Sequence, residues 1–307
     1  MSASAPTPHI AQLWIYPLKS AAGIALPYAE LTPYGLAWDR QWMVVDAQGR
    51  FVSQREVPAL ARVQPQLKGD EMILRAPGML PLHVNLYAYE ADAQVTVWGD
   101  SVPALDLGRV ASQWISDCLS QTPEGQQWVA SHGPLRLVRH HPDHPRASDP
   151  AWTQGDRAQV AFADGFALLV TSQAALDECN DRLQAQGHAP VDMRRFRPNL
   201  VLSGLPPHGE DDVQRVEWVK ADVRVVLKLA KPCPRCAIPD VDPDTGERSE
   251  GVNATLATYR GDARLDGALT FGMNAYWLNA PEEEDEPGPM LQVGDAVSLD
   301  HGFGPEA

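Results

Sequence analysis

Short alternating runs of apolar and polar residues dominate the first hundred positions of this chain. Such runs, separated by Gly and Pro, predict strands that bury one face. The clearest lie at 13–16, 42–45 and 94–98, and residues 46–49 have the composition of a hairpin turn. The pattern therefore predicts a compact, largely antiparallel β-structure in this region.

A change of period near residue 109 predicts a helix. Val110, Trp114 and Cys118 recur at every fourth position, which gives a helix over 109–119 one apolar face. Thr122-Pro123 is interpreted as its end. The polar stretch up to about residue 159 is interpreted as a long loop after a short strand at 135–138.

The second half of the chain returns to strand patterns around one more helix. Strands are predicted at 166–170, 200–202, 216–219, 223–229 and 296–299. A helix over 174–186 has Ser172 as its predicted N-cap and Gly187 as its stop. The acidic run 282–286 is interpreted as a solvated loop. We therefore expect a mainly β fold with some helices (α+β), in two β-based domains.

Composition narrows the class of partner. The 307 residues carry a formal net charge of −15, which argues against nucleic acid or an anionic membrane surface as the main partner. The N-terminus lacks a signal-peptide pattern, and no apolar run reaches the roughly 18 residues of a membrane span. Four cysteines in a chain of this length are not a disulfide scaffold. We expect a protein of the reducing cytoplasm.

The run Lys231-Pro232-Cys233-Pro234-Arg235-Cys236 places two thiols beside two cations. Nearby cations favour the thiolate, which binds soft metals and attacks electrophiles. A structural zinc site requires a second ligand pair, whereas Cys118 and Cys179 are single and distant. A thioredoxin-type pair begins a helix early in a chain, whereas this pair precedes a turn rich in Pro and Asp. The motif favours one thiolate on a redox metal, with dithiol exchange as an alternative.

Other polar clusters suggest anion binding. Arg194, Arg195 and Arg197 fall within four residues, and guanidinium groups match phosphate or carboxylate in two-point geometry. In an extended segment Arg197 and Asn199 would point the same way and could clamp one anion. A solvated basic face is the simpler interpretation of this run. The histidine cluster 140–144 is interpreted as a loop rather than a metal site.

Taken in order, these motifs resemble the MOSC-domain family. Tyr16-Pro17-Leu18-Lys19-Ser20 and Val97-Trp98-Gly99-Asp100 are similar to the MOSC N-terminal β-barrel domain. Five later segments are similar to the MOSC domain itself: 195–201, 233–236, 241–246, 271–274 and 293–295. The order and spacing are similar to the amidoxime-reducing members, mitochondrial and bacterial. The resemblance implies a MOSC N-terminal β-barrel domain over 9–125, packed with a MOSC β-barrel domain over 126–300.

The resemblance also implies a molybdenum cofactor, a molybdopterin, with Cys236 as the protein ligand to the metal. It implies that Asp164 near the metal is catalytic and could relay protons or anchor substrate. Pro234 stands where relatives often have Ser, which removes a hydroxyl and a backbone donor from the ligand loop. The implied cofactor-binding residues are Lys19, Ser20, Arg40, Ser172, Arg197, Asn199, Arg235 and Asn274.

The implied activity is reduction of N-hydroxylated small molecules such as amidoximes, hydroxylamines and N-oxygenated bases. Electrons would come from a separate ferredoxin-, flavodoxin- or cytochrome-type protein. The alternative is a sulfur or cofactor carrier without reductase activity, in which Cys236 holds a persulfide. The family also allows association with pyridoxal phosphate, although no particular lysine in this sequence is marked for a Schiff base.

Overall fold

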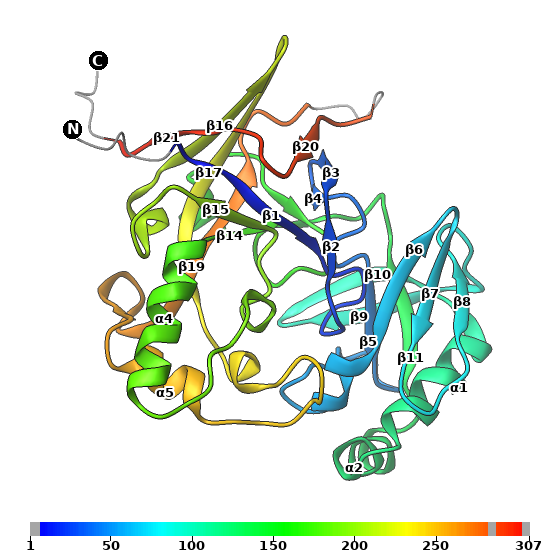
Figure 1. The fold of residues 1–307 in the computed structure, drawn as a ribbon. Coiled ribbons are helices and arrows are strands. Elements are labelled where there is room, and N and C mark those ends of the chain that lie inside the picture. Colours follow the sequence, from blue (N-terminus) through cyan, green and yellow to red (C-terminus); the bar gives the residue numbers. More distant parts are fainter. Residues whose placement is uncertain (1–6, 282–286, 303–307) are drawn as a thin grey trace, which may run out of the picture.

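The computed structural model describes residues 7–281 and 287–302, and its largest element is a nine-stranded sheet (Figure 1). Eight strands lie in the order β2-β1-β15-β14-β19-β17-β16-β21, and β18 pairs with β19. Their bounds are β1 His9–Ile15, β2 Ile24–Leu26, β14 Leu168–Ser172, β15 Leu200–Ser203, β16 Arg215–Lys220, β17 Val223–Pro234, β18 Gly261–Asp262, β19 Ala268–Trp277 and β21 Ser298–Asp300. All pairs are antiparallel except β14 with β15.

The sheet curls until its two ends meet. His9 at the start of β1 bridges Ala296, just before β21, and the Ile10 amide donates to the Asp295 carbonyl. The interior is filled by apolar side chains from distant parts of the chain, among them Ile10, Leu202 and Val297. Closure removes the open edges that would otherwise expose unpaired backbone groups.

A second unit lies beside this barrel. Its four-stranded sheet has the order β5-β11-β10-β9, and a three-stranded sheet has the order β6-β7-β8. The bounds are β5 Trp42–Val45, β6 Gln64–Lys68, β7 Glu71–Arg75, β8 Leu82–Asn85, β9 Ala91–Val97, β10 Asp100–Asp106 and β11 Arg136–His140. Helix α1 (Gly108–Leu119) packs Trp114 and Ile115 into the core of this unit.

Smaller elements connect and cover the two units. They are β3 Tyr28–Thr32, β4 Gly35–Leu36, β12 Arg146–Ala147, β13 Gln159–Val160, β20 Met290–Gln292, and the helices α2 Pro123–His132, α3 Pro150–Thr153, α4 Gln173–Ala185 and α5 Gly251–Ala257. Five 3-10 turns occur in the described ranges: η1 Pro58–Arg62, η2 Met193–Arg195, η3 Gly209–Asp212, η4 Ile238–Asp240 and η5 Ala263–Leu265. Helices α4 and α5 lie side by side against the barrel (Figure 1).

The predicted fold class, mainly β with helices, is confirmed. Both predicted helices exist, and the hydroxyl of Ser172 caps α4 by accepting from the Ala175 amide. The first predicted helix ends at Leu119, before Thr122-Pro123 as expected. The same pair also begins a helix that was not predicted, because Thr122 caps it and Pro123 occupies its first turn. The stretch interpreted as one long loop contains β12, α3 and β13.

The two units are not consecutive along the chain. Strand β1 pairs with β15 in the barrel, although in the chain it precedes the strands of the second unit. Strand β11 lies beyond the predicted boundary at residue 125 yet pairs with β5 and β10. These exchanges place loops from both units against each other. Within the described ranges no helix has the length and apolar character to cross a membrane, and the acidic run 282–286 lies outside them.

Candidate functional site

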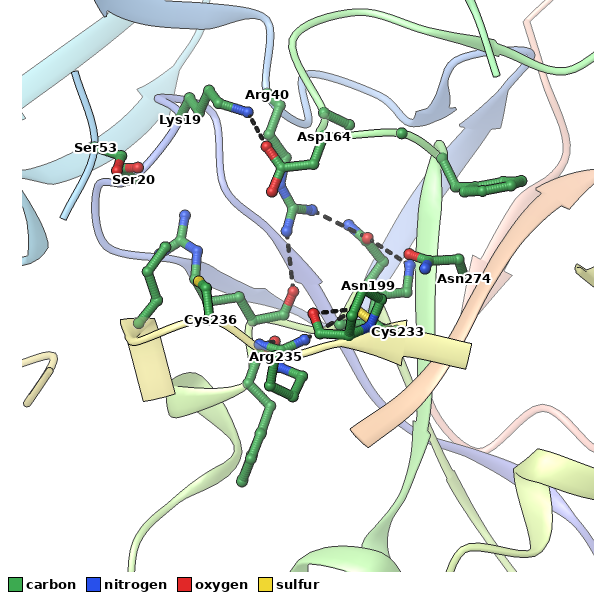
Figure 2. Close-up of a pocket in the computed structure, with 18 of the residues that line it drawn as sticks. Lys19, Ser20, Arg40, Ser53, Asp164, Asn199, Cys233, Arg235, Cys236 and Asn274 are labelled. Carbon is green, nitrogen blue, oxygen red and sulfur yellow. Dashed lines mark hydrogen bonds and ion pairs between the residues drawn. The ribbon is translucent and has the colours of Figure 1, made fainter. Parts of the chain in front are cut away.

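A cavity forms where loops of the two units meet at one side of the barrel. It receives residues from the loop after β1, the segment before β5, the loops before β14 and β15, β19, and the end of β17. Figure 2 shows Lys19, Arg40 and Asp164 on one side of the space and Cys233, Arg235 and Cys236 on the other. The polar and ionisable lining residues are Lys19, Ser20, Arg40, Ser53, Arg55, Asp164, Arg197, Asn199, Cys233, Arg235, Cys236 and Asn274.

Strand β17 delivers the two thiols. It continues past the predicted end at residue 229 to Pro234, and its register against β19 shifts twice, at 229/231 and 232/234. Prolines lack the N–H needed for a regular ladder, so they occur at such irregularities. The chain then turns away, and Cys236 is half-buried with its carbonyl accepting from Asn253 Nδ2 at 2.8 Å.

Arg235 points back from this loop toward the first thiol. Its Nη1 lies 3.1 Å from Cys233 Sγ, and its Nη2 donates to the Phe196 carbonyl at 2.9 Å. The guanidinium therefore orders both the thiol strand and the segment before β15. Its position beside Cys233 rather than Cys236 distinguishes the two cysteines chemically.

Positive charge dominates the cavity of this acidic protein. Of the described residues that line it, five are cationic (Lys19, Arg40, Arg55, Arg197, Arg235), and Asp164 is the one carboxylate. Arg40 is paired with Asp39 at 2.6 Å. In the described part of the chain, Arg197 has no ion pair, and its Nη1 donates to the Ala21 carbonyl at 2.6 Å. Cations without enough carboxylates fit an anionic ligand.

Two of these guanidinium groups lie against one buried ring. The Cζ atoms of Arg40 and Arg197 lie 4.6 and 4.2 Å from the centroid of Tyr16. Burial raises the pKa of Tyr16 far above its usual value, so the ring remains neutral. Burial, together with the charge of Arg40, lowers the pKa of Arg197 to about 10, which leaves it charged at neutral pH. The pair is held close together by cation–π contacts despite its repulsion.

Backbone strain marks the same residues. Ser20, Arg40 and Arg197 have φ values of 66°, 47° and 59°, in the left-handed region that side chains with a Cβ rarely adopt. Such conformations persist where the surroundings impose them, often at functional sites. The expectation of an extended segment from Arg197 to Asn199 was therefore wrong at Arg197. Both side chains still reach the cavity, because the chain turns at Arg197 before it enters β15.

The side-chain amide of Asn199 links several elements through hydrogen bonds. Its Oδ1 accepts from Arg40 Nη1 at 3.0 Å and from the Leu169 amide at 3.1 Å. Its Nδ2 donates to the Trp14 carbonyl at 3.2 Å. The amide thus ties β1, β14 and Arg40 together and fixes the guanidinium that faces the cavity.

Lys19 and Asp164 form an ion pair across the two units. Lys19 Nζ donates to Asp164 Oδ1 and, at 2.7 Å, to the Phe162 carbonyl. Partial desolvation by the cavity walls would raise the pKa of the Asp164 carboxyl, but the charge and hydrogen bond of Lys19 lower it well below its usual range. Burial lowers the pKa of Lys19 against the opposing effect of Asp164. Asp164 is therefore ionised, which suits an anchor for N–H groups better than a proton donor.

Ser172 does not fit its predicted cofactor-binding role. It is fully buried, it is absent from the cavity lining, and its hydroxyl caps α4. The other implied residues all line the cavity: Lys19, Ser20, Arg40, Asp164, Arg197, Asn199, Arg235, Cys236 and Asn274. Sequence reasoning missed Ser53 and Arg55. They follow the strand-like pair Phe51-Val52, and the local pattern carries no signal for a site.

The three histidines of the 140–144 cluster lie in different surroundings, and within the described ranges no group of three or more His, Cys, Asp or Glu is arranged to hold a metal ion. His140 is buried at the end of β11, and its ring meets Phe162 edge-on at 5.5 Å. Burial lowers the pKa of His140 to about 4. His141 and His144 contact each other outside this core.

Comparison with known proteins finds two family domains in this chain. Residues 7–122 match the MOSC N-terminal beta barrel domain, and residues 157–298 match the MOSC domain. Mitochondrial amidoxime-reducing component 1 of Mus musculus is 34% identical over 304 residues, which is 94% of this chain and 82% of that protein. The Homo sapiens protein of the same name is 34% identical over 305 residues, with the same coverage.

A relative with a different name matches the same region. Molybdenum cofactor sulfurase of Oryza sativa subsp. japonica is 27% identical over 309 residues, which is 94% of this chain but 35% of that protein. The present chain thus spans about a third of the sulfurase and most of the amidoxime-reducing components. The chain belongs to the family of proteins that join a MOSC N-terminal beta barrel domain to a MOSC domain.

Proposed function

We propose that this protein is a molybdenum-cofactor-dependent oxidoreductase that reduces N-hydroxylated compounds with electrons from a separate protein. The observation that carries the proposal is a cavity in which half-buried Cys236 lies among five cations and one carboxylate. A thiolate can complete the sulfur ligands of a soft redox metal, and the cations suit the phosphate and pterin of an anionic cofactor.

The residues present fit such a cofactor. Cys236 is the proposed metal ligand, and Lys19, Ser20, Arg40, Arg197, Asn199, Arg235 and Asn274 are the proposed cofactor-binding residues. Arg197 supports this assignment because, within the described ranges, its half-buried guanidinium lacks a carboxylate partner. The cofactor, when bound, would supply two electrons, so that an N–OH group and two protons give N–H and water.

The chain's own groups provide binding and proton handling at the cavity. The Asp164 carboxylate is held ionised by Lys19 and can accept an N–H of the substrate. Lys19, whose pKa burial lowers, can release a proton from Nζ more readily than an exposed lysine. We therefore assign substrate binding to Asp164 and proton donation to Lys19. This assignment replaces the expected proton relay through Asp164.

The names of the relatives favour reduction over sulfur transfer. The amidoxime-reducing components match over most of their length, whereas the sulfurase match leaves about two thirds of that protein without a counterpart here. A persulfide on Cys236 remains the alternative chemistry for a carrier. The electron donor is proposed to be a ferredoxin-, flavodoxin- or cytochrome-type protein.

Metal content and turnover together test the proposal. Wild type, Cys236→Ser and Cys233→Ser would be expressed in a host that makes molybdopterin, and molybdenum per protein would be measured with reduction of benzamidoxime by a reduced dye. Wild type and Cys233→Ser are expected to hold molybdenum and turn over, and Cys236→Ser to lose both. Equal molybdenum in Cys236→Ser would refute the ligand assignment. Sulfur acceptance without turnover by wild type would favour the carrier.

A further inference from the structure

Trp98 occupies a backbone position that does not suit it. Strands β9 and β10 pair with Val97 opposite Asp100, so Trp98 and Gly99 form a two-residue hairpin loop. The first loop residue, Trp98, has a φ of 57°. Gly, Asn and Asp are the residues that favour such a position, and a bulky side chain there is a conformational outlier. Gly99 follows it, in space that is open to a Cβ.

The Trp98 side chain makes contacts that explain why the strained conformation persists. Its Nε1–H donates to Asp164 Oδ1 at 3.2 Å. The Arg55 guanidinium lies 4.5 Å from its ring centroid, and Phe51 meets the ring edge-on at 5.2 Å. The hairpin of one unit therefore presents an indole to the carboxylate supplied by the other unit.

These contacts leave two groups available to a ligand beside the cavity: the indole ring of Trp98 and the Oδ2 atom of Asp164. Trp98 remains 49% exposed beside the lining residues Arg55 and Asp164. Lys19 and Trp98 both donate to Oδ1 of Asp164, and nothing in the described ranges donates to Oδ2. The Asp164 side chain is 66% exposed. An acceptor oxygen thus lies beside an aromatic surface at the border of the cavity.

The charges beside this border favour a neutral ligand over a cation. Lys19 is paired with Asp164, and Arg55 lies over the same Trp98 ring that donates to Asp164, so a cation entering here would meet two positive charges and one negative charge. A neutral group would keep the hydrogen bond to Oδ2 without that repulsion. A flat group would also cover the exposed indole.

We propose that Trp98, Arg55 and Asp164 form a recognition subsite for a neutral, flat substrate that bears N–H donors. This inference rests on the proposed function, because it describes how an N-hydroxylated substrate is oriented. An amidoxime is flat and neutral at neutral pH, whereas the amidine it yields is a strong base and carries a positive charge. The subsite therefore favours substrate over product.

Direct binding tests the subsite without turnover. Benzamidoxime and benzamidine would be titrated into the purified full-length protein by calorimetry at neutral pH. Wild type is expected to bind benzamidoxime more tightly than benzamidine. Trp98→Gly is expected to weaken benzamidoxime binding about tenfold, which corresponds to the loss of a stacking surface. Tighter binding of benzamidine, or no benzamidoxime binding by wild type, would overturn the proposal.

The chain offers a matched control for the backbone effect. Ala221 is the first residue of the two-residue loop between β16 and β17 and has a φ of 52°. Figure 1 shows this hairpin projecting away from the body of the molecule. Trp98→Gly and Ala221→Gly relieve the same strain, so neither is expected to lower Tm, and Ala221→Gly should leave binding unchanged.

The outcomes separate the two proposals. Equal benzamidoxime affinity in wild type and Trp98→Gly would refute the subsite, whatever the turnover. If molybdenum-loaded wild type binds benzamidoxime as expected but does not reduce it, the proposed reductase function would be refuted. A large fall in Tm for Trp98→Gly, with the affinity unchanged, would show that Trp98 is structural.

Discussion

The ammonium group of Lys19, in the loop after β1, lies 2.5 Å from the carboxylate of Asp164, in the loop before β14. The two residues are far apart in sequence and are brought together by the tertiary fold. The ion pair keeps Asp164 charged and aims it at the cavity that contains Cys236. Its charge is therefore a direct target for substitution.

Asp164→Asn should reduce kcat/KM for an N-hydroxylated substrate by roughly ten- to 100-fold, the scale of a lost hydrogen bond to a charged group. The amide oxygen can still accept from Lys19 and Trp98, so the local geometry is kept while the charge is removed. Molybdenum per protein should remain at the wild-type level. An unchanged kcat/KM in a fully loaded variant would contradict the anchor role.

Arg197→Met should stabilise the cofactor-free protein slightly and weaken cofactor retention. The substitution removes a half-buried charge that has no carboxylate partner in the described ranges and that is repelled by Arg40. The gain in unfolding free energy should be about 1 kcal/mol, offset in part by the lost hydrogen bond to Ala21. Urea unfolding and molybdenum content measure the two effects.

Arg194→Met is the matched control for that experiment. Arg194 pairs with Asp192 and Asp244 outside the main cavity, so its loss should weaken stability modestly and leave molybdenum content unchanged. If Arg194→Met and Arg197→Met lost the cofactor equally, the special role of Arg197 would not hold.

His140 and His208 should make the fold sensitive to mild acid. Burial lowers the pKa of each from 6.5 to about 4. Between these values the unfolded chain binds more protons than the folded one, so stability rises with pH and is lost as pH falls below 6.5. Each histidine should reduce the unfolding free energy by about 2 kcal/mol between about pH 7 and about pH 5.

The contribution of one histidine can be isolated with His140→Gln. Urea unfolding of wild type and variant at the two pH values should show a smaller acid loss in the variant by about 2 kcal/mol. Carboxyl groups with raised pKa values, such as Glu210, affect both proteins alike and cancel in the comparison. Identical pH dependence in the two proteins would show that His140 titrates normally.

Ser172→Ala should destabilise the protein by about 1 kcal/mol, the usual effect of losing a helix N-cap. Molybdenum content and kcat/KM should not change, because Ser172 caps α4 and does not line the cavity. Ser172→Thr, which keeps a capping hydroxyl, should recover most of the stability. A loss of molybdenum in Ser172→Ala would restore the cofactor role that the resemblance implied.

Local patterns in the sequence predicted the elements that depend on neighbouring residues. The strand patterns at 216–219 and 223–229, the helix α1 and the cap at Ser172 were all found in this way. The start of α2 was missed because Thr122-Pro123 serves equally well as an end and as a beginning of a helix. The resemblance assigned residues from separate motifs to one site, since no spacing along the chain connects Lys19 with Cys236.

The sequence by itself determined the alternation of strands and turns, the acidic surface charge and the pair of thiols beside cations. The tertiary structure decided which cations share a space, which of them lack a carboxylate partner, and that Asp164 is held ionised by Lys19. It also revealed Arg55 and Trp98 beside that carboxylate. These properties depend on contacts between loops of two interleaved units, and such long-range contacts leave no periodic trace in the order of the residues.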